Sequence, residues 1–288
     1  MLAKVFKRNP YHDTEGRFTS KEKAVEPKLA DYFKKFDNPD VTATDILANF
    51  TPEERGEIAV ARMRAESAPT SKQLYTRNGQ YTTARRALHA KIINEILSEE
   101  NIKRTTPPEG TAPRFVVLGG RGGSGKSAFT NGKIKEFDAS KYLVLDSDAI
   151  KDRLRPPYQG WNAHSVHEES SNIFDTVTQI AKSLRLNIVH DATLKSNSVE
   201  SAVKAFKEDG YGIDGHYMFV PRQVSADRAV KRYLSKGKGQ RGRLVPVDVI
   251  LQNTRNEENF DNLKQHFDNW SAYDNQGAAP KLIGRKAK

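Results

Sequence analysis

A glycine-rich segment directly after a short apolar run constrains this chain more than any other feature. Residues 119–127 read GGRGGSGKS, and residues 114–118 read RFVVL, which predicts a buried strand. From Gly120 onward the segment fits the spacing G-x-x-x-x-G-K-[ST], which is typical of loops that wrap the phosphates of a nucleoside triphosphate. Glycines permit positive φ and a close approach of the backbone to phosphate oxygens, and a helix N-terminus after the loop adds inward-pointing N–H groups.

The loop assigns nucleotide-binding roles to its own residues. Lys126 is expected to reach the β- and γ-phosphates, and the Ser127 hydroxyl is expected to hold Mg²⁺. We therefore expect ATP and Mg²⁺ as cofactors. The expected cofactor-binding residues are Gly120, Arg121, Gly122, Gly123, Ser124, Gly125, Lys126, Ser127 and Ala128.

Beyond residue 114, short apolar runs alternate with helical patterns. Continuous apolar strands separated by helices favour a mostly parallel sheet that is covered on both faces. We predict an α/β fold of the P-loop NTPase type, a three-layer sandwich with a small helical N-terminal extension. Strands are expected at 114–118, 142–145, 186–190 and 216–220, and helices at 82–100, 166–184, 199–206 and 221–235.

Aspartates follow two of these expected strands. Asp146 and Asp148 come after 142–145, and Asp191 follows 186–190. Because ligands bind beyond the carboxyl ends of parallel strands, we expect the three carboxylates to meet the glycine loop at one edge of the sheet. Asp148, in a loop opposite the glycine turn, could accept the proton of an acceptor hydroxyl, and Asp191 suits the metal side with Ser127. Taken singly, each aspartate also fits a helix cap or a turn.

A second unusual stretch is basic. Residues 236–243 read KGKGQRGR, which predicts a flexible cationic loop, and Arg228 and Arg232 lie one helical turn apart just before it. Such lids fold over phosphates and exclude water, and their arginines offset transition-state charge. A solvated basic loop or a contact with a nucleic-acid backbone is the alternative.

The residues expected to bind the acceptor substrate form a less distinctive sequence pattern than the phosphate loop. Residues 155–162 read RPPYQGWN, an irregular loop whose aromatic side chains either wall a pocket or simply pack. His167 and Glu168 open the next helix and could line the same pocket, whereas a Glu at a helix start often simply interacts favourably with the helix dipole. The expected substrate-binding residues are Asp146, Trp161, His167, Glu168, Asp191 and Thr193.

The amino-acid composition limits the kinds of partner that the chain is expected to bind. The 288 residues carry a net charge of +11, which favours anionic substrates or polyanions, nucleic acid among them, although a plain basic surface is the alternative. The chain contains no cysteine, so disulfides and thiolate metal sites are excluded. No apolar run approaches the length of a membrane span, so no membrane partner is expected.

The N-terminal part reads differently from the rest. We predict a boundary that separates residues 1–70 from a kinase-like domain at 71–288. Residues 1–26 are polar and broken by turn formers, which predicts an extended or disordered arm. Short helices are expected at 27–36 and 51–65, and they are too small to stand alone, so they should pack on the larger domain or on a partner.

The ordered combination of motifs resembles the zeta toxin family of P-loop kinases. The residues that carry the resemblance are GGRGGSGKS, VLDSDAIK, HEESSNIFD, NIVHDAT, ADRAVKRY and GRLVP, within about residues 75–280. The resemblance implies that Lys126 is the phosphate lysine, that Asp148 is the general base, and that Arg232 and Arg243 contact the γ-phosphate. Asp191 stands where the family often has Glu in an EGT sequence.

The resemblance also implies an activity. Members of the family phosphorylate the 3′-hydroxyl of the sugar in UDP-N-acetylglucosamine and so deplete a precursor of the bacterial cell wall, and relatives use dinucleotides or antibiotics. We therefore expect a toxic kinase of the bacterial cytoplasm that acts on a nucleotide-type acceptor. A small helical antitoxin that blocks the ATP site is its expected partner.

Two other functions stay open. The positive charge suits a kinase of nucleic-acid ends or dinucleotides. The segment NPYHDTEGRFTSK resembles leaders of bacteriophage head and virion-associated proteins, which suggests a virion component that keeps an ATP-binding scaffold. Contacts with capsid proteins would then run through residues 1–70.

Overall fold

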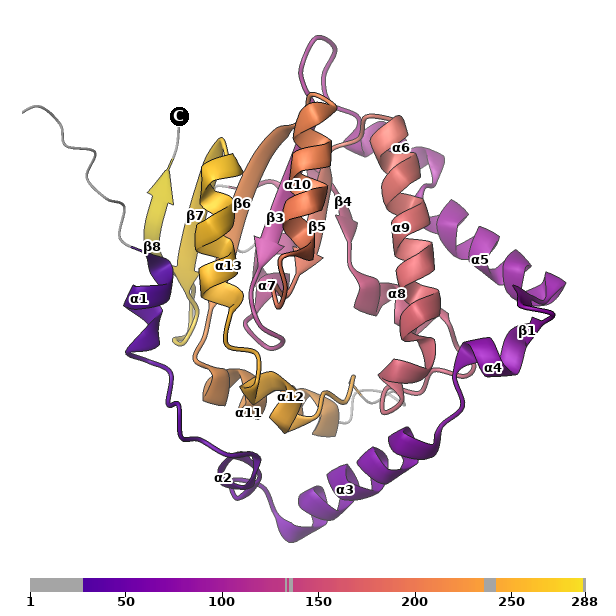
Figure 1. Cartoon of the computed structure of the whole chain (residues 1–288). Coiled ribbons are helices and arrows are strands. Elements are labelled where there is room, and N and C mark those ends of the chain that lie inside the picture. Colours follow the sequence, from indigo (N-terminus) through magenta and orange to yellow (C-terminus); the bar gives the residue numbers. More distant parts are fainter. Residues whose placement is uncertain (1–27, 133, 135–136, 236–241, 287–288) are drawn as a thin grey trace, which may run out of the picture.

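The computed structural model describes residues 28–132, 134, 137–235 and 242–286. The centre of this region is a six-stranded sheet with the order β4-β5-β3-β6-β7-β8 (Figure 1). All neighbouring pairs are parallel except β7 and β8, which are antiparallel. The strands are β3 (Arg114–Gly119), β4 (Leu143–Leu145), β5 (Ile188–Ala192), β6 (Gly212–Phe219), β7 (Asn269–Asp274) and β8 (Lys281–Lys286), and a separate hairpin joins β1 (Thr76–Arg77) to β2 (Gln80–Tyr81).

Helices precede the sheet and connect its strands. The α-helices are α1 (Leu29–Lys34), α2 (Ala43–Leu47), α3 (Pro52–Ser67), α4 (Ser71–Tyr75), α5 (Thr83–Ile96), α6 (Glu99–Thr105), α7 (Lys126–Thr130), α8 (Ser147–Arg153), α9 (His167–Ser183), α10 (Ser198–Glu208), α11 (Arg222–Leu234), α12 (Val247–Leu251) and α13 (Asn256–Leu263). The short 3-10 helices are η1 (Ala139–Lys141), η2 (Ala163–Val166) and η3 (Lys264–His266). None of the described helices is long and apolar enough to cross a membrane.

The sheet has the alternating strand-and-helix pattern that the sequence predicts. On one face lie α9, α10 and α13 (Figure 1), and α9 buries Ile173, Val177 and Ala181, which recur every four residues on one side of the helix. The other face packs against α7 and the segment around η1, where Phe129 and Phe137 stack. The predicted α/β architecture is therefore confirmed.

The strand register places the segments that follow β3, β4 and β5 at the same end of the sheet. Gly119, the last residue of β3, pairs with Ala192 of β5 and with Tyr217 of β6. On the other side of β5, Leu145 of β4 pairs with His190. Because these strands are parallel, the segments that follow β3, β4 and β5 leave the sheet at the same edge.

The N-terminal helices pack on the sheet region. In α1, Phe33 stacks on Phe219 of β6 with ring centroids 3.6 Å apart. Helices α2 and α3 form a separate apolar cluster with α11 and α12, to which Ile46, Ile58 and Tyr233 contribute. Thr51 and Glu54 make the capping box that starts α3. The predicted arm at residues 1–26 lies outside the described residues.

One predicted helix is divided. The sequence predicts a single helix at 82–100, whereas the structure has α5 and α6 with a break at Leu97 and Ser98. The Ser98 hydroxyl accepts a hydrogen bond from the Asn101 N–H and so begins a new helix. The apolar stripe concealed this cap because Ser98 lies at its end.

Candidate active site

A cleft of about 700 Å³ opens at the carboxyl edge of the parallel strands. The glycine loop after β3, the start of α8, the end of β5, helix α11 and the segment around α12 all contribute to its walls. The polar and glycine residues that line it are Arg121, Gly122, Gly123, Gly125, Lys126, Ser127, Asp146, Ser147, Asp148, Lys151, His167, Asp191, Thr193, Lys195, Arg228, Arg232, Arg243 and Asn253. The structure thus brings the glycine loop and the three predicted aspartates into one space.

The glycine loop has a backbone that side chains would disturb. Gly125 has a φ of 86°, and a Cβ there would lie 2.1 Å from the side-chain nitrogen of Asn275. The same nitrogen donates a hydrogen bond of 2.8 Å to the Ser124 carbonyl oxygen. The loop is therefore fixed from the β7–β8 side in a conformation that only glycine adopts easily at residue 125.

Lys126 lies across this loop. Its ammonium group donates hydrogen bonds to the carbonyl oxygens of Gly120, at 2.7 Å, and Arg121, at 3.3 Å. It also lies 3.5 Å from an oxygen of Asp191. Burial raises the pKa of Asp191, and the charge of Lys126 acts in the opposite direction.

Asp148 belongs to a helix, not to the loop that the sequence predicts. Asp146 is the N-cap of α8, and its side chain accepts a hydrogen bond of 2.8 Å from the Asp148 N–H. The cap satisfies a free helix-end N–H and starts the helix at Ser147, which places Asp148 in the first turn. One oxygen of Asp148 accepts a hydrogen bond of 2.9 Å from Lys151, and the other pairs with Arg243.

Three arginines contribute to the cleft from a different direction. Arg228 and Arg232 come from α11, and Arg243 comes from the segment before α12. A Cβ on Gly242 would lie 2.5 Å from the Arg232 carbonyl oxygen, so the two chain segments are in close contact there. Burial lowers the pKa of Arg243, and the charge of Asp146 opposes that shift. The predicted lid lies outside the described residues from 236 to 241.

Three predicted residues do not offer their side chains to a ligand in the cleft. The Arg121 side chain is 1% exposed and pairs with Glu257, so only its main chain remains for phosphate binding. Trp161 packs against the cluster of α2, α3, α11 and α12. Glu168 pairs with Lys72 at 2.8 Å on the surface. The other predicted substrate-binding residues, Asp146, His167, Asp191 and Thr193, line the cleft.

Lys151 is a lining residue whose role the sequence analysis did not consider. It is 4% exposed, and burial lowers its pKa, against the opposing charge of Asp146. Its effect extends to His167, whose pKa is lowered by burial and by the charge of Lys151. The spacing of three residues from Asp148 along a helix is the signal that could have indicated the pair.

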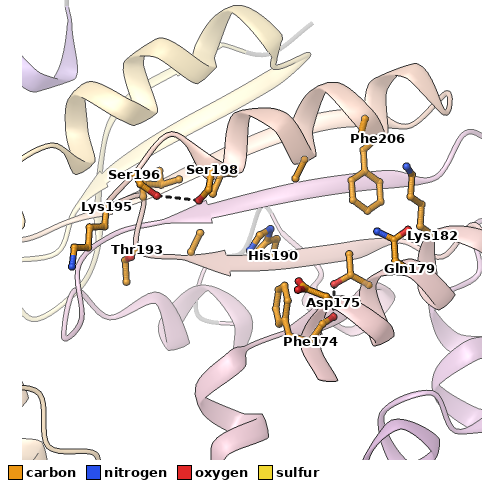
Figure 2. Close-up of a pocket in the computed structure, with 16 residues that line it drawn as sticks. Phe174, Asp175, Gln179, Lys182, His190, Thr193, Lys195, Ser196, Ser198 and Phe206 are labelled. Carbon is orange, nitrogen blue, oxygen red and sulfur yellow. Dashed lines mark hydrogen bonds between the residues drawn. The ribbon is translucent and has the colours of Figure 1, made fainter. Parts of the chain in front are cut away.

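A second hollow of about 460 Å³ lies between α9 and α10, over β5 (Figure 2). It shares Thr193 and Lys195 with the cleft. In Figure 2, His190 lies on β5 with Phe174 of α9 beside it, and their ring centroids are 5.1 Å apart. Burial lowers the pKa of His190 to about 4, so the imidazole is neutral at pH 7 and can either donate or accept a hydrogen bond.

Comparison with protein families gives one match that covers more than half of the chain. Residues 98–281 match the family described as Zeta toxin. This segment includes the glycine loop, the aspartates and the arginines of the cleft. A search of curated proteins gave no match.

Solved structures support the same fold. The crystal structure of the AvrRxo1-ORF1:-ORF2 complex with ATP has a TM-score of 0.60 and 17% identity, and the alignment covers 77% of each chain. A structure of the PezAT chromosomal toxin-antitoxin system of Streptococcus pneumoniae has a TM-score of 0.52 and 17% identity, over 72% of this chain and 81% of that one. At this identity the likeness shows the fold alone.

Proposed function

The chain belongs to the zeta toxin family of ATP-dependent P-loop kinases, and from this premise we propose that it phosphorylates a sugar hydroxyl of UDP-N-acetylglucosamine. The observation that carries the proposal is the shared cleft, whose walls include both the glycine loop with Lys126 and the carboxylate of Asp148. A phosphate-binding loop and a base that share one space are the two parts that a sugar kinase needs.

On the nucleotide side, the main-chain N–H groups of the glycine loop would bind the phosphates of ATP. Lys126 would exchange its hydrogen bond to the Gly120 carbonyl oxygen for the β- and γ-phosphate oxygens. Arg232 and Arg243 would neutralise the charge that develops on the transferred group. The adjacent Arg228 donates a hydrogen bond to the Gln276 carbonyl oxygen, which limits its own reach.

On the acceptor side, the reaction needs a base. Asp148 would take the proton of the sugar hydroxyl as its oxygen forms a bond with the γ-phosphorus. The bond between that phosphorus and the bridging oxygen of ADP breaks in the same step, so ADP leaves with the electron pair. The Asp148 side chain is 40% exposed, which leaves it accessible to an acceptor.

The hollow between α9 and α10 would hold the rest of the acceptor. Phe174 and His190 offer ring surfaces, and Gln179 offers donor and acceptor atoms at the same wall (Figure 2). Thr193 and Lys195 connect this hollow to the cleft, where Lys195 can meet a diphosphate. A sugar nucleotide consists of a flat base, a diphosphate and a sugar, in this order. The ring surfaces of the hollow would hold the base, Lys195 would bind the diphosphate, and the cleft would hold the sugar.

A magnesium ion fits the cleft without a dedicated protein cage. Within the described part of the chain, no group of three or more histidine, aspartate or glutamate side chains could hold a metal. Mg²⁺ is commonly held by one or two carboxylates, phosphates and water. Ser127 and Asp191 would supply the protein ligands, and the ion would add positive charge beside the phosphates.

We also propose that a small antitoxin restrains the kinase. One of the similar structures is from a toxin-antitoxin system, and the other contains two proteins, AvrRxo1-ORF1 and -ORF2. Coexpression with its neighbouring genes, followed by purification through a tag on this chain, would test this. A protein that copurifies and suppresses ATP consumption is the expected result.

The test of activity is to incubate the protein with ATP, Mg²⁺ and UDP-N-acetylglucosamine and to follow the phosphorylated sugar by mass spectrometry. Lys126→Ala should lower the rate at least about 100-fold, and Asp148→Asn about 10² to 10⁴-fold. Lys141→Ala and Asp152→Asn are matched controls, because both residues pair on the surface outside the cleft lining.

The controls should keep the rate of the unmodified protein. Transfer to a 5′-hydroxyl oligonucleotide with no transfer to the sugar nucleotide would instead support the nucleic-acid reading. No ATP turnover with any acceptor, together with association with capsids, would support a scaffold.

A further inference from the structure

The two oxygens of Asp148 are held by cations of different kinds. Lys151 donates to one oxygen at 2.9 Å from three residues along the same helix. Arg243 pairs with the other oxygen from the segment before α12. Each oxygen of the base proposed above therefore has a cationic partner, and an acceptor hydroxyl competes with one of these cations for the carboxylate.

Burial separates the two cations. The Lys151 side chain is 6% exposed, and its ammonium group donates a hydrogen bond to the Asp148 carboxylate. Moving this buried ammonium from its carboxylate would leave a charge in a poorly solvated place. The Arg243 side chain is 28% exposed and lines the cleft together with Arg232, and both arginines are assigned to the γ-phosphate. Arg243 is thus the more exposed of the two cations and the one that has a phosphate to bind in place of Asp148.

From this asymmetry, and resting on the proposed function, we propose that Lys151 is a positioning residue for the base. Lys151 keeps one oxygen of Asp148 in place throughout the reaction. Arg243 leaves the other oxygen for the γ-phosphate when ATP binds, and the freed oxygen then receives the acceptor hydroxyl. Arg243 consequently competes with the acceptor hydroxyl for the base until ATP has entered the cleft.

Lys126, like Arg243, has contacts that a phosphate could replace. Lys126 bonds to two carbonyl oxygens of its own loop and lies near Asp191. Two of the cations assigned to the transferred phosphate, Lys126 and Arg243, thus have replaceable partners within the cleft. Lys151 differs from them because its side chain is buried and its ammonium group donates a hydrogen bond to the proposed base itself.

Kinetics provide the first test. Lys151→Met should lower kcat about 100-fold while the KM for ATP changes less than twofold, because a base that is misplaced slows transfer without weakening phosphate binding. Lys151→Arg should recover at least a tenth of the lost rate by restoring a cation near Asp148. A KM for ATP that rises with the fall in kcat would overturn the proposal, since Lys151 would then act on the nucleotide.

A matched control separates positioning from stability. Lys264 also pairs with an aspartate three residues earlier, Asp261 at 2.7 Å, and its side chain is 10% exposed. It lies outside the cleft lining, so Lys264→Met should lower the melting temperature and leave kcat unchanged. Equal falls in kcat for the two methionine variants would reduce Lys151 to a purely structural role and refute the proposal.

A structural test does not depend on knowing the acceptor. A crystal structure of the unmodified protein with a non-hydrolysable ATP analogue should keep the contact between Lys151 and Asp148 and break the one between Arg243 and Asp148. Arg243 still on Asp148 with the analogue bound would contradict the inference. Absence of sugar phosphorylation would count against the proposed acceptor only, because this measurement would still decide the arrangement of the base.

Discussion

Two buried ion-pair networks lie behind the cleft, and they have opposite charges at their centres. Behind the glycine loop, the Arg121 guanidinium binds Glu257 of α13 and lies 3.3 Å from Asp37, which follows α1. Behind the cleft wall at α9, the Glu169 carboxylate accepts hydrogen bonds of 2.6 and 2.9 Å from Arg85 and contacts His89 at 2.5 Å. The first is a cation with two carboxylates, and the second is a carboxylate with two basic side chains.

The comparison shows how the N-terminal segments take part in the kinase. Asp37, Arg85 and His89 all precede residues 98–281, the segment that matches the family. The residues that they pair with, Arg121 and Glu169, lie inside it. Segments outside the family region therefore supply counter-charges to buried groups within it, and a buried charge that loses its counter-charge is costly.

The largest effect should come from Glu169→Gln. Arg85 is 5% exposed, and it would lose its paired carboxylate, so we expect the free energy of unfolding to fall by about 3–5 kcal/mol. Urea denaturation measures this fall. Glu258→Gln is the control, because Glu258 pairs with Arg255 on the surface and should change stability by less than about 1 kcal/mol. A loss below about 1 kcal/mol for Glu169→Gln would mean that the network adds little.

Acid should weaken the same network. Burial acts to raise the pKa of Glu169, but hydrogen bonds from His89, Arg85 and Ser71 outweigh it and lower the pKa to about 2. Since the folded pKa lies below the ordinary value of 4.5, this stability is complete above pH 4.5 and is lost as the pH falls toward 2. The full effect is about 3 kcal/mol.

Urea unfolding between pH 6 and 3 measures this acid effect. The difference in stability between the unmodified protein and Glu169→Gln should narrow as the pH falls below 4.5. A constant difference over this range would show that the carboxylate does not titrate as inferred.

A smaller effect is expected at the first network. Asp37→Asn should cost about 1–2 kcal/mol, because Arg121 keeps Glu257 and loses only its second carboxylate. Thermal unfolding would report the loss. Asp37→Asn could instead lower the free energy of unfolding as much as Glu169→Gln does. In that case a second carboxylate beside Arg121 would not reduce the loss, and the two networks would not differ in the way we infer.

The smallest effect is expected for Lys72→Ala. Lys72 pairs with Glu168 at 2.8 Å, one residue before the buried Glu169, but the two side chains are 56% and 58% exposed. Water and salt screen such pairs, so we expect no measurable change in the free energy of unfolding. Chemical denaturation at low and high salt would measure it, and a loss near that of Glu169→Gln would show that burial is not what separates the two pairs.

Much of the site could be predicted because its signals are local. The glycine spacing specifies a backbone conformation within nine residues, and the strand ends place Asp146, Asp148 and Asp191 at one edge once the sheet is parallel. The assigned roles of these residues remain predictions. Lys151 was missed because a lysine near an aspartate is common, and only burial distinguishes this pair from a surface contact.

The placement of Arg121 and Trp161 could not be predicted from the sequence. A guanidinium in a phosphate loop suggests a phosphate contact, yet the nearest buried carboxylate, Glu257, is 136 residues away along the chain. Trp161 packs against an apolar cluster to which the N-terminal helices α2 and α3 contribute residues. Both outcomes depend on partners that a local pattern does not contain.

The sequence by itself determined the α/β sheet, the phosphate loop and the edge at which the site forms, because these follow from short-range periodicity and from the conformational freedom of glycine. The tertiary structure alone decided which charges are buried and which partner each one has. The pair of Arg85 and Glu169 joins residues 84 positions apart, and its strength depends on the exclusion of water by several packed segments. Solvent exclusion is a property of the folded chain and is not present in any short stretch of it.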